Sequence, residues 1–342
     1  MIAFIRSRAP SALVTPEALA RLEILANRLP DAMSSYYLEC RLAANFEQVD
    51  LMGCVSAADG GRELLRSHLL RDERFHVHPV WSAVARFCAA WSEPGTVLFD
   101  LVPHVWLAFD VDESYSWERG PCILLCLDPK YPDGTARLQQ FDQIKTLQTR
   151  LFTDPAFVSW LKECGRLLTS RLVSFHDLLP SSAQLLHLSL MLSRSPQLWK
   201  LNILLPKVEL LPYLSRISYG RFDLGVCGVL SQFAGEREWI KFQIVVNENV
   251  APALEIELHF DESNSFQQQY RGVLDRLCQA NLCSQEKKEA LRSWPGRVRV
   301  AGPGKQWPTR WTTWTDIKIA YQPEYLTSVK AYLGFMPSSS VL

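Results

Sequence analysis

The sequence lacks the features that mark membrane proteins and nucleic-acid-binding proteins. No apolar stretch reaches the roughly 18 residues that a membrane-spanning helix needs, and residues 1–12 contain only the short apolar run from Ile2 to Ile5, too little for a secretory signal. Neither charge is in excess, since Lys plus Arg and Asp plus Glu both number 36. We therefore expect no membrane or nucleic-acid partner, and any site for an anion must be local.

The cysteines lack the spacing of a metal site. There are nine, without a CxxC pair or a Cys/His ligand pattern. Because an odd number is scattered through apolar segments, we predict buried free thiols, a reducing compartment and hence a cytoplasmic location. The cysteines in these segments are Cys40, Cys54, Cys88, Cys122 and Cys126.

Several catalytic motifs are also missing. No GxxxxGK pattern accompanies Gly60 and Gly61, so these glycines indicate a turn and a helix start rather than a phosphate loop. His76 and His78 have no third ligand nearby, and we predict no metal site. The chain also has no nucleophile-elbow motif for Ser-His-Asp catalysis.

What the chain does contain is a regular alternation of helical pairs and β-hairpins. Its 48% hydrophobic and 21% charged residues are ordinary for a protein with a large core. Helical spacing and strand alternation predict one helix and a hairpin, followed by four units of two helices and a hairpin. The predicted hairpins are 36–43 with 48–55, 104–111 with 122–128, 186–193 with 199–205, 239–247 with 253–260, and 316–323 with 329–335. The predicted helices are 16–29, 61–70, 79–91, 135–152, 155–172, 207–217, 224–233, 265–280 and 284–293.

This order predicts an α+β fold in which residues 1–342 form a single domain. Five ααββ units would form a ten-stranded antiparallel β-barrel surrounded by helices. Closure removes the exposed edges that ten consecutive strands would otherwise leave, and a barrel wider than eight strands has room for a ligand. The alternative is a pair of open α+β sandwiches that divide near Leu172.

Alternation along each strand separates an apolar face from a polar face. If the apolar faces contact the helices, cations on four of the five hairpins point into the lumen. Buried charges need a partner or a ligand, so this pattern predicts a ligand site, although solvated outer faces would also alternate. The predicted inward set is Tyr37, Glu39, Arg41, Asp50, Met52, Cys54, His104, Trp106, Ala108, Asp110, His187, Ser189, Met191, Lys200, Asn202, Lys241, Gln243, Glu255, Glu257, His259, Trp314, Asp316, Lys318, Lys330 and Tyr332.

Five ααββ units in a ten-stranded barrel resemble the ABBA (PT-barrel) aromatic prenyltransferases. The fungal indole, bacterial phenol or quinone, and cyanobactin-type peptide branches of that family bind an allylic diphosphate in the lumen. Lys318 and the Lys330-Ala-Tyr332 segment are similar to the family's Lys-x-Tyr strands, which hold the diphosphate. The segment from Leu38 to Arg41 is similar to its acidic first-strand motif, which grips the acceptor.

The resemblance implies transfer of a dimethylallyl or geranyl group from its diphosphate to an aromatic small molecule or a peptide side chain, as in natural product biosynthesis. Fixed cations would stabilise the leaving diphosphate, and aromatic faces the allyl cation. The chain has no DDxxD run, so no cofactor is expected beyond optional Mg²⁺ with the diphosphate. The implied residues are Glu39 and Asp50 for catalysis; Arg41, Lys200, Lys241, Lys318, Lys330 and Tyr332 for the diphosphate; and Tyr37, Trp106, Met191, Glu257 and Trp314 for the substrate.

A second hypothesis is a barrel of the same kind that binds a peptide or hydrophobic ligand without prenyl transfer, as a biosynthetic accessory protein. It is favoured by Ala320, which stands where the family often has a second tyrosine, and by Asp50, which stands where it often has a cation. The segment from Arg297 to Trp314 mixes arginines with tryptophans, and we interpret it as a loop that gates substrate entry.

Overall fold

Eleven strands form one antiparallel sheet in the computed structural model of this protein. The structure describes residues 1–58, 60–71, 73–114, 116–127, 148–165, 174–194, 198–217, 223–246, 254–260, 264–301, 308–322 and 325–338. The strands are β1 Met33–Arg41, β2 Val49–Ser56, β3 His104–Phe109, β4 Cys122–Cys126, β5 Gln184–Leu190, β6 Trp199–Pro206, β7 Trp239–Val246, β8 Leu254–Phe260, β9 Gly296–Val300, β10 Thr309–Gln322 and β11 Tyr325–Pro337.

Ten of these strands close into a ring. Neighbouring strands pair in chain order from β1 to β8, β8 pairs with β10, β10 with β11, and β11 returns to β1. In the closing pair Leu38 lies opposite Leu333. β4 pairs with β5 across the proposed division near Leu172, so the alternative of two separate sheets is wrong. The predicted ten-stranded antiparallel ααββ barrel is confirmed.

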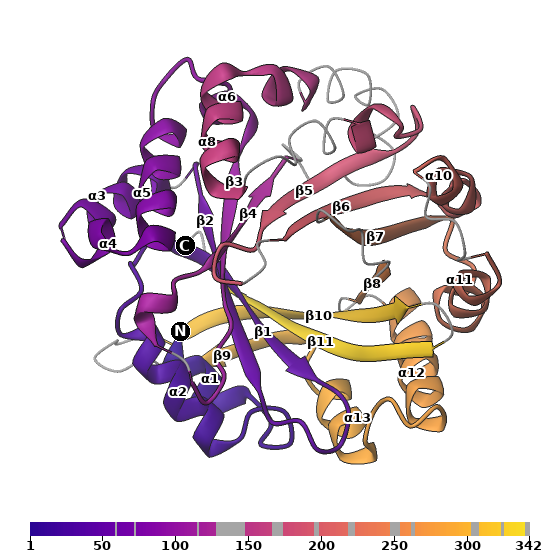
Figure 1. Cartoon of the computed structure of the whole chain (residues 1–342). Helices are drawn as coiled ribbons and strands as arrows, with labels where there is room; N and C mark the ends of the chain where they lie inside the picture. Colours follow the sequence, from indigo (N-terminus) through magenta and orange to yellow (C-terminus); the bar gives the residue numbers. More distant parts are fainter. Residues whose placement is uncertain are drawn as a thin grey trace.

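Helices surround this ring on its outer side (Figure 1). None of those within the described ranges is long and apolar enough to cross a membrane. The predicted helix 135–152 lies mostly outside the described residues, as do the second half of 155–172 and the turn at 195–196. The helices are α1 Ile2–Arg8, α2 Pro16–Ala26, α3 Gly61–Arg71, α4 Arg74–Val77, α5 Pro79–Trp91, α6 Val97–Leu101, α8 Pro155–Gly165, α10 Leu210–Arg216, α11 Asp223–Val229, α12 Asn264–Gln279 and α13 Gln285–Arg292, with short turns η1 Trp117–Arg119, η2 Lys207–Glu209 and η3 Leu230–Ala234.

Local sequence signals set where several of these helices begin. Thr15 accepts a hydrogen bond from the Ala18 amide at 3.2 Å, and Pro16 follows at the first helical position of α2. Ser284 caps α13 in the same way. Such side chains satisfy amides that have no partner inside the helix.

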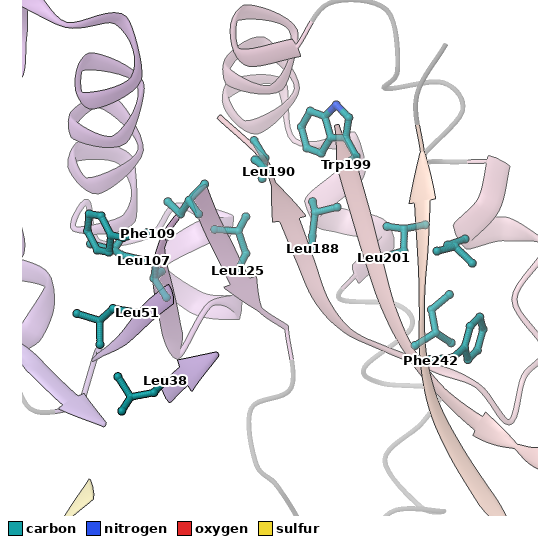
Figure 2. Close-up of a cluster of buried hydrophobic side chains, with 14 of the residues drawn as sticks. Leu38, Leu51, Leu107, Phe109, Leu125, Leu188, Leu190, Trp199, Leu201 and Phe242 are labelled. Atoms are coloured by element: carbon teal, nitrogen blue, oxygen red, sulfur yellow. The ribbon is translucent and has the colours of Figure 1, made fainter. Parts of the chain in front are cut away.

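The main core is the layer between the strands and the helices. Figure 2 shows the outward-facing side chains of β1 to β7 that build part of it. Full burial of each large apolar side chain stabilises the fold by about 1.5–3 kcal/mol. The labelled residues, all buried, are Leu38, Leu51, Leu107, Phe109, Leu125, Leu188, Leu190, Trp199, Leu201 and Phe242.

The first unit has the second helix that its sequence pattern does not reveal. In α1 the Phe4 ring stacks on Trp311 with centroids 4.5 Å apart and on Phe335 at 4.9 Å. α1 therefore covers the outer face of β10 and β11, beside which β1 lies (Figure 1). With seven residues, the helix is too short for periodicity to show it.

The predicted gating loop from Arg297 to Trp314 is largely strand. β9 pairs with the outer half of β10, with Trp311 opposite Val298, and Thr313 Oγ1 donates to the Gly296 carbonyl at 3.0 Å. Residues 302–307 between the two strands lie outside the described residues. The interpretation as a loop is wrong for the described part, because this Gly/Pro-rich segment contains the alternating run from Arg297 to Val300.

A buried lysine ties α13 to the turn between β1 and β2. The Lys287 ammonium donates to the carbonyls of Arg41 at 2.9 Å, Ala43 at 2.9 Å and Phe46 at 2.6 Å. Only 7% of the residue is exposed. These charge-assisted bonds satisfy three carbonyls of a turn that forms no ladder of its own.

We predict that Lys287→Met lowers the free energy of unfolding by about 2–4 kcal/mol, because it leaves three backbone carbonyls without their charged donor. Urea unfolding followed by tryptophan fluorescence measures this change. Lys288→Met is the matched control, since Lys288 pairs with the exposed Asp275 at the surface. An equal effect of both substitutions would contradict the role of Lys287.

Candidate functional site

The barrel encloses a cavity of about 540 Å³. Its wall contains four aromatic residues, three histidines and two lysines, all on strands of the ring. A mostly apolar lining with a few convergent polar groups is typical of small-molecule sites. These residues are Tyr37, Trp106, Trp314, Tyr332, His104, His187, His259, Lys241 and Lys318.

The cavity occupies the half of the barrel near the connections between helices and strands. Ser56 ends β2, His104 begins β3 and Cys126 ends β4, and all three contribute to its wall. The opposite half of the barrel carries the hairpin turns. There the next inward positions along β11 and β1 are Lys330 and Glu39.

A cluster of ion pairs lies in the lumen between this turn end and the cavity, whose wall includes its members Lys241, Glu257 and Lys318. We call it the ion-pair layer. Lys330 pairs with Glu39, and Lys241 with Glu257. Lys200 Nζ lies 3.0 Å from Glu255 Oε1. The layer comprises Glu39, Lys200, Lys241, Glu255, Glu257, Lys318 and Lys330, four lysines facing three glutamates.

Lys318 is the lysine that the glutamates share. Its Nζ lies 3.5 Å from Glu255 Oε2 and 3.7 Å from Glu257 Oε2. The same ammonium lies 4.6 Å from the centroid of the Tyr332 ring, within the range of a cation–π contact. Its side chain is 11% exposed and lines the cavity, so Lys318 is the cation at the boundary between the two halves of the lumen.

The charges of the layer hold each other ionised. Burial would raise the pKa of Glu39, but the Lys330 ammonium and then Lys318 lower it to about 2. Burial likewise opposes ionisation of Glu257, whose pKa Lys241 and Lys318 lower to about 2. These carboxylates stay charged at neutral pH because desolvated lysines surround them.

The pKa of Asp50 is shifted in the opposite direction. It lies opposite Glu39 in the pairing of β1 with β2 and is 6% exposed. Burial and then the Glu39 charge raise the pKa of Asp50 to about 6. Its Oδ1 accepts hydrogen bonds from the Val111 amide at 2.8 Å and from Gln48 Nε2 at 2.9 Å.

Four side chains form a hydrogen-bonded chain on one wall of the cavity. Trp314 Nε1 donates to the Tyr37 hydroxyl at 2.7 Å, and that hydroxyl donates to Asp316 Oδ2 at 2.7 Å. Asp316 Oδ1 lies 2.6 Å from His259 Nδ1. Asp316 is 3% exposed, so this carboxylate lies at the centre of a buried network.

A glycine makes this chain possible. Gly334 of β11 stands between Tyr37 of β1 and Trp314 of β10 in the strand registers. A Cβ at Gly334 would overlap the indole ring of Trp314. The absent side chain therefore lets Trp314 reach across β11 to Tyr37.

The structure divides the residues predicted for the site into two groups. Seven line the cavity: Tyr37, Trp106, Lys241, Glu257, Trp314, Lys318 and Tyr332. The other six, Glu39, Arg41, Asp50, Met191, Lys200 and Lys330, are outside the cavity wall. The functional roles of both groups stay predictions.

Sequence reasoning placed His259 and Asp316 on the inward face without assigning them a role. They lie opposite each other in the pairing of β8 with β10. The signal for their contact is the register of strands from two different hairpins, which alternation alone does not give. Gln243, which accepts from Lys318 Nζ at 3.2 Å, is a further inward residue that received no role.

No family model matches the chain, and no curated protein matches it. One similar solved structure is the crystal structure of 5-dimethylallyltryptophan synthase from Streptomyces coelicolor. The match covers 99% of this chain and 95% of that chain, with 13% identity and a TM-score of 0.49. At this identity and TM-score the neighbour assigns no activity or substrate to this protein, whose barrel is defined by its own strand pairing.

The raised pKa of Asp50 makes a prediction about stability. Because the folded-state pKa of about 6 exceeds the ordinary value of 3.8, the contribution of Asp50 is fully present below pH 3.8 and is lost as pH rises to about 6. Asp50→Asn keeps the Oδ1 acceptor and removes the charge. We expect Asp50→Asn to exceed the wild type in unfolding free energy at pH 7.5 by up to about 3 kcal/mol.

At pH 4 the two proteins should be equally stable, since Asp50 is then protonated. Urea unfolding at both pH values measures the difference. A constant difference between Asp50→Asn and the wild type at pH 4 and pH 7.5 would rule out a titrating, destabilising carboxylate at this position.

Proposed function

We propose that this barrel transfers an allylic prenyl group, dimethylallyl or geranyl, from its diphosphate to an aromatic small molecule or an aromatic peptide side chain. The observation that carries the proposal is the presence of Lys241 and Lys318 in the wall of a cavity that also contains four aromatic side chains. The lysines suit a diphosphate leaving group, and the aromatic walls suit a prenyl chain and its cation.

In this proposal the lysines and the aromatic residues of the cavity hold different parts of the prenyl diphosphate. A diphosphate at Lys241 and Lys318 would direct its prenyl chain toward Trp106, Tyr37 and Trp314. Tyr37 and Trp106 have ring centroids 5.2 Å apart, and Tyr37 and Trp314 5.5 Å. Such rings stabilise positive charge and exclude the water that would quench it.

The glutamates of the ion-pair layer compete with a bound diphosphate for the lysines. Each lysine of the layer already contacts a carboxylate, so an incoming diphosphate must compete with Glu255 and Glu257. We infer that binding requires these side chains to turn away or take up protons. No step needs a metal in this scheme, although Mg²⁺ bound to the diphosphate is compatible with it.

The second candidate is a barrel that binds a peptide or hydrophobic ligand without prenyl transfer. It is favoured by the same ion pairs, because four lysines against three glutamates leave little excess positive charge for a diphosphate. In either case we infer a cytoplasmic location from the buried cysteines Cys40 and Cys88, which form no disulfide.

The proposal is tested directly by incubating the protein with radiolabelled dimethylallyl or geranyl diphosphate and an acceptor. The acceptors are indoles, phenols and peptides containing Trp or Tyr. We expect transfer to at least one acceptor class, with and without EDTA. Calorimetric titration with a non-hydrolysable thiolodiphosphate analogue measures binding separately. Absence of both transfer and binding would overturn prenyl transfer and leave the second candidate.

Substitutions in the ion-pair layer should change diphosphate affinity in opposite directions. Lys318→Met removes a cation, and we expect it to raise the Kd of the thiolodiphosphate by about tenfold or more. Glu257→Gln releases Lys241 and Lys318 from a competing carboxylate, and we expect it to lower the Kd by about threefold or more. Titration calorimetry measures both values.

Lys288→Met, on the outer helix α13, serves as the matched control for loss of a lysine. If Glu257→Gln binds the thiolodiphosphate no better than the wild type while Lys318→Met binds it equally well, the ion-pair layer is not the diphosphate site.

A further inference from the structure

We propose that His259, positioned by Asp316, accepts the proton that an aromatic acceptor loses when it is alkylated in this lumen. The role rests on the proposed function, because it concerns the second substrate of the same reaction. It assigns a proton-transfer site to a histidine of β8 rather than to the carboxylates Glu39 and Asp50.

The geometry of His259 suits this role. Its side chain is 43% exposed and lines the cavity, whereas the carboxylate that contacts it is 5% exposed. One edge of the imidazole faces this buried anion, and the side chain contributes to the cavity wall, where an acceptor would bind. The backbone carbonyl of His259 accepts from Arg237 at 3.0 Å, which holds the strand position.

Asp316 sets the proton arrangement on the imidazole. A buried carboxylate 2.6 Å from Nδ1 favours the tautomer with the proton on Nδ1, which leaves the lone pair on Nε2. Tyr37 donates to the other oxygen of Asp316 and so fixes the carboxylate in place. An imidazole held by a carboxylate in this way is the arrangement used for general bases in hydrolases.

The carboxylates predicted for catalysis are less suited to the same task. Lys330 holds the Glu39 carboxylate in an ion pair, and neither Glu39 nor Asp50 is part of the cavity wall. A general base must reach the proton that it removes. Among the histidines of the wall, burial and then Lys241 lower the pKa of His187 to about 3, which makes it a weak base.

Transfer of the prenyl group from the allylic diphosphate to the acceptor needs no further reactant. The C1–O bond of the allylic diphosphate breaks, and the diphosphate leaves with the electron pair. A new bond forms between C1 and the acceptor's nucleophilic atom, which is a ring carbon of an indole or phenol or its nitrogen or oxygen. The acceptor loses one proton to His259 Nε2, and the imidazolium is stabilised by the Asp316 carboxylate.

Steady-state kinetics of His259→Gln test the proposal first. We expect kcat for prenyl transfer to fall by about 10²- to 10⁴-fold, the usual contribution of a general base. Binding of the thiolodiphosphate should change by less than about threefold, because the diphosphate lies at the lysines. Imidazole added to His259→Ala should restore part of the rate, which it would not do for a purely structural loss. His68→Gln, on the outer helix α3, is the matched control.

Nitrogen-15 NMR of labelled histidines provides a readout that needs no transfer. The His259 signals are identified by their loss in His259→Gln. In the wild type we expect the Nδ1-protonated tautomer and a shift of the Nε2 resonance when a phenol or indole is added. Asp316→Asn should move the proton to Nε2, since an amide that donates to Nδ1 reverses the preference.

The two measurements separate the inference from the proposed function. Transfer by the wild type with an unchanged kcat in His259→Gln overturns the role of His259 and leaves prenyl transfer standing. Absence of transfer overturns prenyl transfer together with the proton-transfer role, and an Nε2 shift on acceptor binding then shows only that His259 contacts the bound phenol or indole. Absence of the Nε2 shift, or the opposite tautomer in the wild type, overturns the inference by itself.

Discussion

Pairing of buried charges inside a closed barrel is the constraint on which this structure depends. Once β11 pairs with β1, the inward side chains of the ring enter an enclosed lumen, where the charged side chains of the ion-pair layer are only 11–20% exposed. An unpaired ammonium or carboxylate is costly there. Lysines and glutamates of neighbouring strands, and of β6 and β8 on either side of β7, therefore pair with each other, and the ion-pair layer is the result of closure as much as of any ligand.

This layer makes the two halves of the lumen chemically different. Charged side chains in mutual contact lie toward the turn end, and the opposite half holds an aromatic cavity with histidines on its wall. Lys318 belongs to both parts, since it contacts two glutamates and the Tyr332 ring. A ligand with an anionic group and an apolar chain matches this division, and a purely apolar ligand matches half of it.

The same wall shows how local sequence and long-range pairing combine in one site. Gly334 leaves a gap in β11 through which Trp314 reaches Tyr37, and Tyr37 in turn contacts Asp316. These residues come from both ends of the chain and meet only because the barrel closes. Loss of the gap would separate groups that no short-range signal places together.

Alternation and helical periodicity by themselves determined the ten strands of the ring in their order, most of the described helices and the inward face of the residues that line the cavity. They did so because both signals are local: side-chain direction follows from the backbone period alone. They missed α1, which has seven residues, and the strand β9 within a Gly/Pro-rich segment. Which inward residues contact each other was decided only by the tertiary structure. The contact of His259 with Asp316 and the sharing of Lys318 depend on the registers between hairpins, which are fixed by packing of the whole barrel and not by any one segment.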